Sequence, residues 1–232
     1  MMILFDLDGT LIDTTDLILA SFAWTFDQHL PGRLPERDAL VQTFGRSLPA
    51  VLRELAVEHG DSDHDVLTTR LLGSYRDFQK AQHDTLIKPF PGVAEMLRTL
   101  RAHGRRLGLV TSKREGFARR GLALFGLETL FEIAVFHDDT PRHKPEPDPL
   151  LLAAERAGVA PADVMYVGDS IHDVAAGRAA GMRTVSVLWG PFDRATLERA
   201  GPDIIVARPE DLVALLLKDE GRETRGADDS PS

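Results

Sequence analysis

Two aspartates near the start of the chain are the first residues that could do chemistry. Asp6 and Asp8 directly follow a short apolar run, and Gly9 comes next. Because side chains two apart in an extended stretch share one face, both carboxylates can point into one cavity. Gly9 permits a tight turn with a positive φ angle. The pair could attack or protonate a substrate, but an Asp-Gly turn that ends a strand, with Asp8 as a cap, would have the same sequence.

A second acidic group follows another apolar run late in the chain. Asp169 and Ser170 come directly after that run, and Asp173 lies shortly beyond them. Carboxylates gathered at one point repel each other unless a cation is present. Oxygen donors with no cysteine and no clear set of histidines favour Mg²⁺. The alternative for Asp169 is a loop acid that only caps the next helix.

Hydroxyl and ammonium groups follow two further apolar runs. Thr111 and Ser112 precede a predicted helix, where hydroxyls and free backbone amides can bind an anion. Lys144 lies in a proline-rich stretch, which holds a side chain at low entropic cost, and a lysine is a compact charge suited to phosphate. A plain helix N-cap at Thr111 and a solvated surface lysine at 144 are the alternatives. We expect Lys113 and Arg114 mainly on the helix surface.

Short apolar runs that alternate with helical patterns must position these side chains. This alternation predicts parallel strands joined by crossover helices, and therefore an α/β, Rossmann-like open parallel sheet with helices on both faces. Ligands bind such sheets outside the carboxyl ends of the strands, where all four groups fall. The predicted strands are 2–5, 106–110, 133–136, 164–167, 184–188 and 204–206, and the predicted helices are 92–103, 115–125, 147–157, 173–180, 195–200 and 209–217.

One long segment departs from this alternation. Its apolar residues have helical spacing, and it contains no convincing strand, which predicts an all-helical domain inserted after the first strand. The last residues are charged and rich in Gly, Asp and Ser, so we expect them to be disordered. The predicted boundaries are 1–13 and 91–217 for the sheet domain, 14–84 for the helical insertion, 85–90 for a return linker and 218–232 for a disordered tail.

Composition narrows the class of protein. The chain has 232 residues with 27 basic and 36 acidic side chains, a net charge of -9 that argues against a nucleic-acid partner. It has no cysteine, which excludes disulfides and cysteine-based phosphatase chemistry. No apolar run is long enough to cross a bilayer, and the first residues do not resemble a signal peptide. We therefore expect a cytoplasmic protein without a membrane partner.

These motifs together resemble those of the haloacid dehalogenase superfamily. Their order and spacing agree with that family over nearly all of the chain before the tail. The helical insertion corresponds to the family's C1 cap, whose closure would restrict access to small substrates. The matching residues are Asp6-Leu7-Asp8-Gly9-Thr10 for the first motif, Thr111 for the second, Lys144 for the third and Gly168-Asp169 with Asp173 for the fourth.

The resemblance implies a chemical role for each motif. Asp6 would attack phosphorus and form an aspartyl-phosphate. Asp8 would protonate the leaving oxygen and then activate the hydrolytic water. Asp6, the backbone carbonyl of Asp8 and Asp169 would hold Mg²⁺. The phosphoryl group would be bound by Thr111, Ser112 and Lys144, with Asp173, Gly9 and Ser170 in support.

The resemblance also bears on the substrate. An acid at Asp8 favours phosphate chemistry over dehalogenation, because a halide leaves without a proton. The chain is similar to phosphoglycolate phosphatases and to bacterial pyrophosphatases of the PpaX type. The first prediction is hydrolysis of a small phosphorylated metabolite, phosphoglycolate-like; pyrophosphate hydrolysis, phosphoryl transfer as in β-phosphoglucomutase and a non-catalytic binding protein are the alternatives.

Two residues of the insertion, and the oligomeric state, remain to be considered. Arg46 lies between two predicted helices and could clamp an anionic group of the substrate, although an exposed loop arginine is the alternative. His83 lies near the return linker, where we expect a surface histidine. The sequence is compatible with a monomer or a homodimer.

Overall fold

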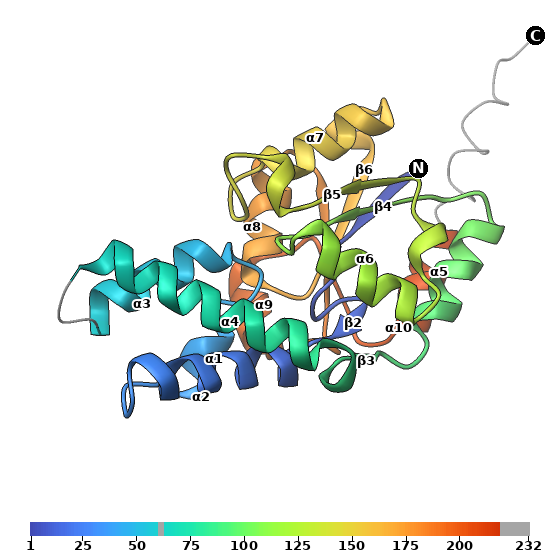
Figure 1. Ribbon diagram of the computed structural model, residues 1–232. Helices are drawn as coiled ribbons and strands as arrows, with labels where there is room; N and C mark the ends of the chain where they lie inside the picture. The colour runs from blue at the N-terminus through green and yellow to red at the C-terminus, as the bar shows by residue number, and fades with distance from the viewer. Residues whose placement is uncertain (60–62, 219–232) are drawn as a thin grey trace, which may run out of the picture.

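The sheet domain confirms the predicted α/β architecture. The computed structural model describes residues 1–59 and 63–218 (Figure 1). Its main sheet has six parallel strands in the order β5-β4-β1-β6-β7-β8, so β1 lies inside the sheet with a neighbour on each side. The strands are β1 (Met2–Phe5), β4 (Arg106–Val110), β5 (Ile133–Val135), β6 (Val164–Gly168), β7 (Arg183–Val187) and β8 (Ile204–Val206).

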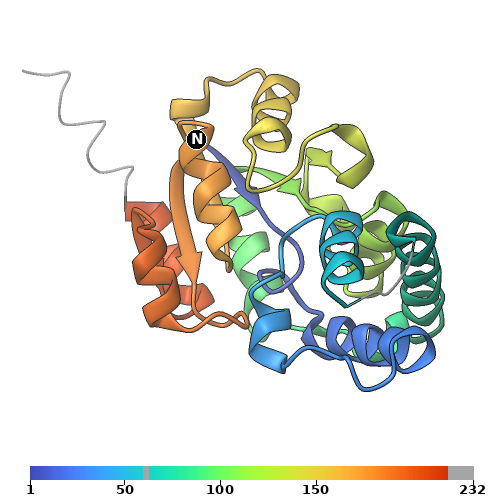
Figure 2. The ribbon, with the colours of Figure 1, turned by 90° about the vertical axis from the view of Figure 1, so that its left-hand side faces the viewer.

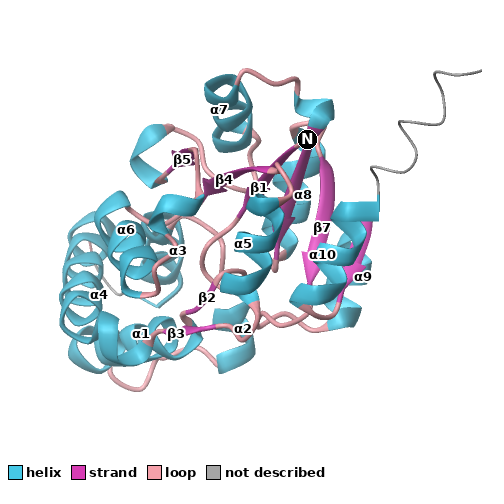
Figure 3. Cartoon of the chain, turned by 90° about the vertical axis from the view of Figure 1, so that its right-hand side faces the viewer, coloured by secondary structure: helices cyan, strands magenta, loops and turns pink. Residues whose placement is uncertain are grey.

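Helices cover both faces of this sheet, as Figure 3 shows. The side chains of β1 alternate, so that Ile3 and Phe5 lie in one hydrophobic cluster while Met2 and Leu4 lie in the other. The Ile3 face packs against α5 (Val93–Ala102), α6 (Glu115–Leu124) and α10 (Pro209–Lys218). The Met2 face packs against α7 (Asp148–Ala157) and α8 (Ile171–Ala179), and α9 (Arg194–Ala200) lies beside α8. Burial on both faces explains why the strands are almost entirely apolar.

The predicted helical insertion forms a separate group of helices beside the sheet (Figure 2). It consists of α1 (Thr15–His29), α2 (Arg37–Val41), α3 (Leu48–His59) and α4 (His64–Leu86). These helices enclose a hydrophobic cluster of their own, in which the rings of Phe22 and Tyr75 meet edge to face at 5.1 Å. The insertion therefore has a core of its own, while Val41 and Phe44 pack in a second cluster against Phe192 and Leu197 of the sheet domain.

A short antiparallel ribbon joins the two parts. It pairs β2 (Ile12–Asp13) with β3 (Lys88–Pro89). Helix α4 continues to Leu86, so the predicted return linker consists of the helix end and β3 rather than an extended connection. The domain boundaries themselves remain a prediction. The described part of the chain also contains the 3₁₀ helices η1 (Glu128–Leu130), η2 (His137–Asp139) and η3 (Pro161–Asp163).

The C-terminal boundary differs slightly from the prediction. Lys218 belongs to the last turn of α10, and residues 219–232 of the predicted tail lie outside the described residues. Within residues 1–59 and 63–218, no helix combines the length and apolar character that crossing a bilayer requires.

Candidate active site

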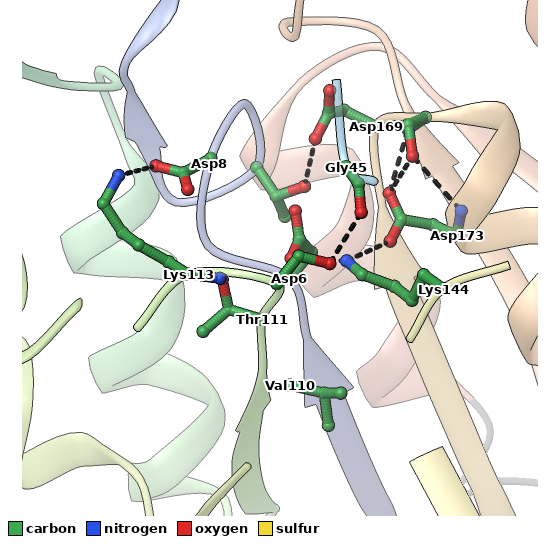
Figure 4. A network of polar contacts seen from close by, with 12 residues as sticks. Asp6, Asp8, Gly45, Val110, Thr111, Lys113, Lys144, Asp169 and Asp173 are labelled. Carbon is green, nitrogen blue, oxygen red and sulfur yellow. Dashed lines mark hydrogen bonds and ion pairs between the residues drawn. The ribbon is translucent and has the colours of Figure 1, made fainter. Parts of the chain in front are cut away.

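The predicted site residues gather at the carboxyl edge of the sheet (Figure 4). Asp6 follows β1 and is 2% exposed; its backbone N–H donates to the carbonyl of Val167 at 2.9 Å, which fixes it beside β6. Carboxylate oxygens of Asp6, Asp169 and Asp173 all lie within 4.8 Å of one another, and all three residues are buried. The structure therefore brings Asp6 together with two acids that lie more than 160 positions later in the sequence.

Lys144 supplies the positive charge for this acidic cluster. Its Nζ donates to Oδ1 of Asp6 at 2.7 Å, to Oδ1 of Asp173 at 2.8 Å and to the hydroxyl of Tyr166 at 3.2 Å. The side chain is 1% exposed, so it is not a solvated surface lysine. The peptide bond between Lys144 and Pro145 is cis.

Asp173 anchors Lys144 and the first turn of α8. Its Oδ1 also accepts from the Tyr166 hydroxyl at 2.8 Å, while Oδ2 accepts from the hydroxyl of Ser170 at 2.6 Å and from its backbone N–H at 3.0 Å. Ser170 and Asp173 thus form a capping box, and α8 starts at Ile171, two residues earlier than predicted. With both carboxylate oxygens bonded within the protein, Asp173 positions other groups and is poorly placed to bind a metal ion directly.

Asp169 is held by groups that the sequence did not indicate. The hydroxyl of Thr10 donates to its Oδ1 at 2.8 Å, and the indole of Trp189 donates to the carbonyl of Thr10 at 2.8 Å. Gly190 packs against it so closely that an added Cβ would lie 2.5 Å from Cβ of Asp169 and 2.7 Å from the carbonyl oxygen of Gly9. Only a glycine fits at that position, and Gly9 itself has φ of 85°.

Burial raises the pKa of both Asp6 and Asp169. Desolvation raises the pKa of Asp6 to about 7, although the charge of Lys144 opposes this. Desolvation likewise raises the pKa of Asp169 well above its ordinary value, with repulsion from Asp173 and Asp6 in addition. Each carboxylate would ionise fully at neutral pH only beside an added positive charge.

Asp173 and Lys144, the other two members of this network, are both charged. Desolvation opposes ionisation of Asp173, but attraction to Lys144 and hydrogen bonds from Lys144, Ser170 and Tyr166 outweigh it, so its pKa is lowered. Desolvation also opposes the charge on Lys144, yet Asp173 and Asp6 raise its pKa well above the ordinary value. Asp6 and Asp169 therefore form an oxygen-only, electron-rich pair that fits a hard divalent cation.

Asp8 lies apart from the acidic cluster, and its partner corrects a prediction. Its Oδ1 accepts from Nζ of Lys113 at 2.6 Å. The side chain of Lys113 is 8% exposed, so it lies in the site and not on the helix surface as expected. Arg114 does lie on the surface, where it faces Asp138 at 3.5 Å. Helix α6 begins at Glu115 as predicted, but Lys113 lies in the loop before it and reaches across to a residue 105 positions away in the sequence, a contact that local sequence does not show.

Thr111 and Ser112 line the same cavity as Asp8. Thr111 is buried, and its Oγ1 accepts from the backbone N–H of Lys113 at 3.1 Å, whereas Arg114 is the residue at the N-cap of α6. The hydroxyl of Ser112 donates to the carbonyl of Gly45 in the helical insertion at 2.7 Å. Ser112 therefore links the sheet domain to the insertion, and its phosphate-binding role remains a prediction.

The two predicted residues of the insertion differ in outcome. Arg46 lines the cavity, where its guanidinium forms a two-point ion pair with Glu54, one contact at 2.8 Å. Its contact with substrate remains a prediction. His83 is buried, with 1% of its side chain exposed, and Nδ1 lies 2.8 Å from Asp84. The expected surface position of His83 is wrong, because α4 packs its last turns against α6.

Four residues of the site were not assigned by sequence reasoning: Thr10, Lys113, Tyr166 and Trp189. Tyr166 carried the clearest signal, because it is the single polar-tipped side chain between the apolar residues of β6, and a buried tyrosine hydroxyl usually finds a partner. Thr10 belongs to the first motif but was given no role, and its contact with Trp189 has no local signal because it joins residues 179 positions apart.

This fold and this acidic site define a hydrolase that acts on phosphoric ester or phosphoanhydride bonds. A family model described as haloacid dehalogenase-like hydrolase matches residues 3–187, most of the chain. The protein belongs to that family, as its motifs indicated.

Named relatives and solved structures agree with the family. A protein named pyrophosphatase PpaX from Bacillus pumilus is 37% identical over 214 residues, which cover 92% of this chain and 95% of that protein. A PpaX from Bacillus velezensis is 37% identical over 91% of this chain and 94% of its own. The crystal structure of a hydrolase from Pseudomonas syringae superposes with a TM-score of 0.81 at 30% identity, covering 93% of this chain and 97% of that one.

Proposed function

We propose that this protein hydrolyses inorganic pyrophosphate through an aspartyl-phosphate on Asp6, with Mg²⁺ as cofactor. The similarity over 92% of the chain to proteins named pyrophosphatase carries the choice of substrate. Hydrolysis of a phosphoglycolate-like substrate, the first prediction from the sequence, is the second candidate function, because the relatives reported above are named pyrophosphatases. A cytoplasmic location and a monomeric or dimeric state belong to the same proposal.

Asp6 has the environment that a nucleophile at this edge needs. Its Oδ1 is held by Lys144, which leaves Oδ2 to attack phosphorus. In this proposal Lys144, bonded to Asp6, offers its charge to the transferring phosphoryl group, and Thr111, which lines the cavity with Asp6, binds the same group. Because phosphoryl transfer depends mainly on positioning and charge neutralisation, these fixed groups supply most of what the protein must contribute.

Asp6 and Asp169, with the backbone carbonyl of Asp8, would hold Mg²⁺. The raised pKa of both side chains and their oxygen-only chemistry support this assignment. Bound Mg²⁺ would neutralise phosphoryl oxygens and orient phosphorus. Asp173 keeps Lys144 and α8 in place.

Asp8 is placed to exchange protons with the substrate. It lines the cavity, and its carboxylate is held by Lys113 on the side away from the acidic cluster. In this proposal Asp8 gives a proton to the leaving phosphate and takes one from the water that attacks the aspartyl-phosphate.

The choice of substrate can be tested by phosphate release. We expect the purified protein with Mg²⁺ to release phosphate from pyrophosphate with a higher kcat/KM than from phosphoglycolate. Phosphate release should be followed across a panel of small phosphorylated metabolites at equal concentration. Turnover of phosphoglycolate with none of pyrophosphate would contradict the proposed substrate and restore the second candidate.

Removal of the metal is expected to stop the reaction. EDTA should abolish phosphate release, and excess Mg²⁺ should restore it, because the single charge of Lys144, shared with Asp173, does not offset the burial of Asp6 and Asp169. Ca²⁺ should restore little, since its larger and looser coordination shell spoils in-line geometry. Metal binding should also release protons near pH 7, measurable in weakly buffered solution without any substrate. Full activity in EDTA would contradict a metal at this site.

Replacing Lys113 tests its role as a positioning residue. Lys113→Met should lower kcat by about 10-fold or more, with a smaller change in KM, because Asp8 loses the charged hydrogen bond that fixes its carboxylate. Lys113→Arg should restore part of kcat, and Lys80→Met, which removes an exposed lysine of α4, should change neither constant. An unaltered kcat in Lys113→Met would show that Asp8 needs no such support.

A further inference from the structure

A cavity lies between the helical insertion and the sheet edge. Asp6, Asp8 and Thr111 line it at the sheet edge. Three further lining residues carry nitrogen groups and come from separate elements: Arg76 from α4, Arg114 from the start of α6 and His137 from η2. We call Arg76, Arg114 and His137 the basic cluster. It is not part of any motif that identifies the family.

The members of the basic cluster lie close enough to repel one another. Desolvation lowers the pKa of Arg76, and the positive charge of Arg114 lowers it further. Desolvation also lowers the pKa of His137, together with the neighbouring His143, whose ring stacks on it at 4.1 Å. Asp138 offsets only part of this effect. Gathering like charges in a partly desolvated place is unfavourable unless an anion joins them.

Arg76 differs from the other cations that line the cavity. Lys113 is bonded to Asp8, Arg46 to Glu54, and Arg114 faces Asp138. Within residues 1–59 and 63–218, no carboxylate lies within ion-pair distance of Arg76. A guanidinium presents paired donors that match a phosphate or carboxylate.

His137 adds an unsatisfied polar atom. Its Nδ1 is buried and has no hydrogen-bond partner within the described part of the chain. A buried polar atom without a partner is unfavourable, so a ligand or water that bonds to it is favoured. The lowered pKa keeps the ring neutral near pH 7, where it can donate or accept one hydrogen bond.

We propose that the basic cluster binds an anionic group on the leaving part of the substrate, which is the second phosphate when the substrate is pyrophosphate. This inference rests on the proposed function, because it needs Asp6 to take the other phosphoryl group. The bond from Asp6 Oδ2 to phosphorus forms as the bridging P–O bond breaks. The electron pair passes to the bridging oxygen, which receives the proton of Asp8, and the departing phosphate stays paired with Arg76 and Arg114 until release.

This arrangement would select substrates by the charge of their leaving part. A leaving phosphate or a carboxylate could pair with two guanidinium groups, whereas an uncharged aromatic leaving part could not. Because Arg76 belongs to the insertion and Arg114 to the sheet domain, such an anion would also draw the two parts of the chain together. The choice of substrate and the approach of the insertion to the sheet domain would then both depend on the contacts of Arg76 and Arg114 with this anion.

A substitution at Arg76 provides the test. With Arg76→Gln, we expect the ratio of kcat/KM for pyrophosphate to kcat/KM for p-nitrophenyl phosphate to fall about 10-fold or more, mainly through KM for pyrophosphate. Arg114→Gln should act in the same direction, and Arg76→Lys should restore part of the ratio. Arg70→Gln removes an exposed arginine from the same helix, outside the cavity, and should leave the ratio unchanged. An unchanged ratio in both Arg76→Gln and Arg114→Gln would overturn the inference.

Direct binding separates this inference from the proposed function. Methylenediphosphonate, which cannot be hydrolysed at its P–C–P bridge, should bind the wild-type protein with Mg²⁺ in a calorimetric titration and bind Arg76→Gln about 10-fold more weakly. A wild type that binds this probe but prefers phosphoglycolate would refute only the pyrophosphatase proposal, and the ratio test is then made with phosphoglycolate. Equal affinity in wild type and Arg76→Gln, or no binding in either, would overturn the basic cluster as an anion site.

Discussion

Asp6→Asn is expected to abolish turnover of every substrate, with a loss of at least about 10³-fold in kcat, because the amide cannot form the covalent phosphoryl intermediate. The side chain keeps its size, so Lys144 can still bond to its oxygen and to Asp173. Phosphate release under saturating Mg²⁺ measures the loss. Retention of more than a few per cent of the wild-type kcat would contradict the assignment of Asp6 as the nucleophile.

The same variant should fold at least as stably as the wild type. The folded-state pKa of Asp6 is raised from 3.8 to about 7 by desolvation. The stability that this group contributes is fully present below pH 3.8 and is lost as the pH rises through 7. Without divalent metal, the free energy of unfolding of Asp6→Asn should therefore exceed that of the wild type by about 1–3 kcal/mol at pH 8. This range allows for the weaker bond to Lys144. Near pH 4 the two proteins should be equally stable. Urea unfolding in EDTA at the two pH values measures this.

Lys144→Met is expected to damage both activity and stability. It leaves Asp6 and Asp173 buried beside each other without a cation, which costs about 3–5 kcal/mol. The pKa of Asp173, lowered in the wild type mainly by Lys144 against desolvation, should then rise. Above the unfolded pKa of Asp173, its ionisation stabilises the wild-type protein, and the variant loses this stability. The difference in free energy of unfolding between wild type and variant should therefore grow as the pH rises. Phosphate release should fall by about 10²-fold or more.

An exposed ion pair is the matched control for Lys144→Met. Lys88 and Asp16 lie 2.8 Å apart with 63% and 59% of their side chains exposed. Lys88→Met should shift the urea midpoint far less than Lys144→Met does, because water screens an exposed pair. Urea midpoints at pH 6 and pH 8 compare the two variants. Equal losses would show that burial of the Lys144 network has no special energetic weight.

Much of the sheet domain could be predicted because its physical signals are local. Short apolar strands followed by polar residues indicate a buried parallel sheet, and the side chains at the strand ends then share one edge. Asp6, Lys144 and Asp169 could be identified in this way, since each follows or lies near a predicted strand end. The start of α8 was predicted two residues too late, because Asp173 was taken as the first residue of the helix. In the structure Ser170 is the N-cap, and Asp173 is the third residue of the helix.

The remaining features depend on contacts between distant segments. Lys113 was taken for a helix-surface residue because nothing in its neighbourhood shows that it reaches across to Asp8. His83 has the polar flanks of a surface residue, yet it is buried where α4 packs against α6. The bond from Ser112 to Gly45 joins the two parts of the chain and has no counterpart in local sequence. Such contacts follow from how the insertion docks, which hydrophobic periodicity does not encode.

The ribbon of β2 and β3 has a consequence for how such a protein can change over time. Since paired strands lie about 4.8 Å apart, the chain leaves the sheet domain and returns to it at nearly the same point. The described residues between Asp13 and Lys88 therefore form an insertion with a hydrophobic interior of its own, which meets the sheet domain through a limited set of contacts. Changes in the length or sequence of its helices need not shift Asp6 or Asp169. Evolution can therefore alter which substrates enter the cavity while the catalytic residues of the sheet domain stay the same.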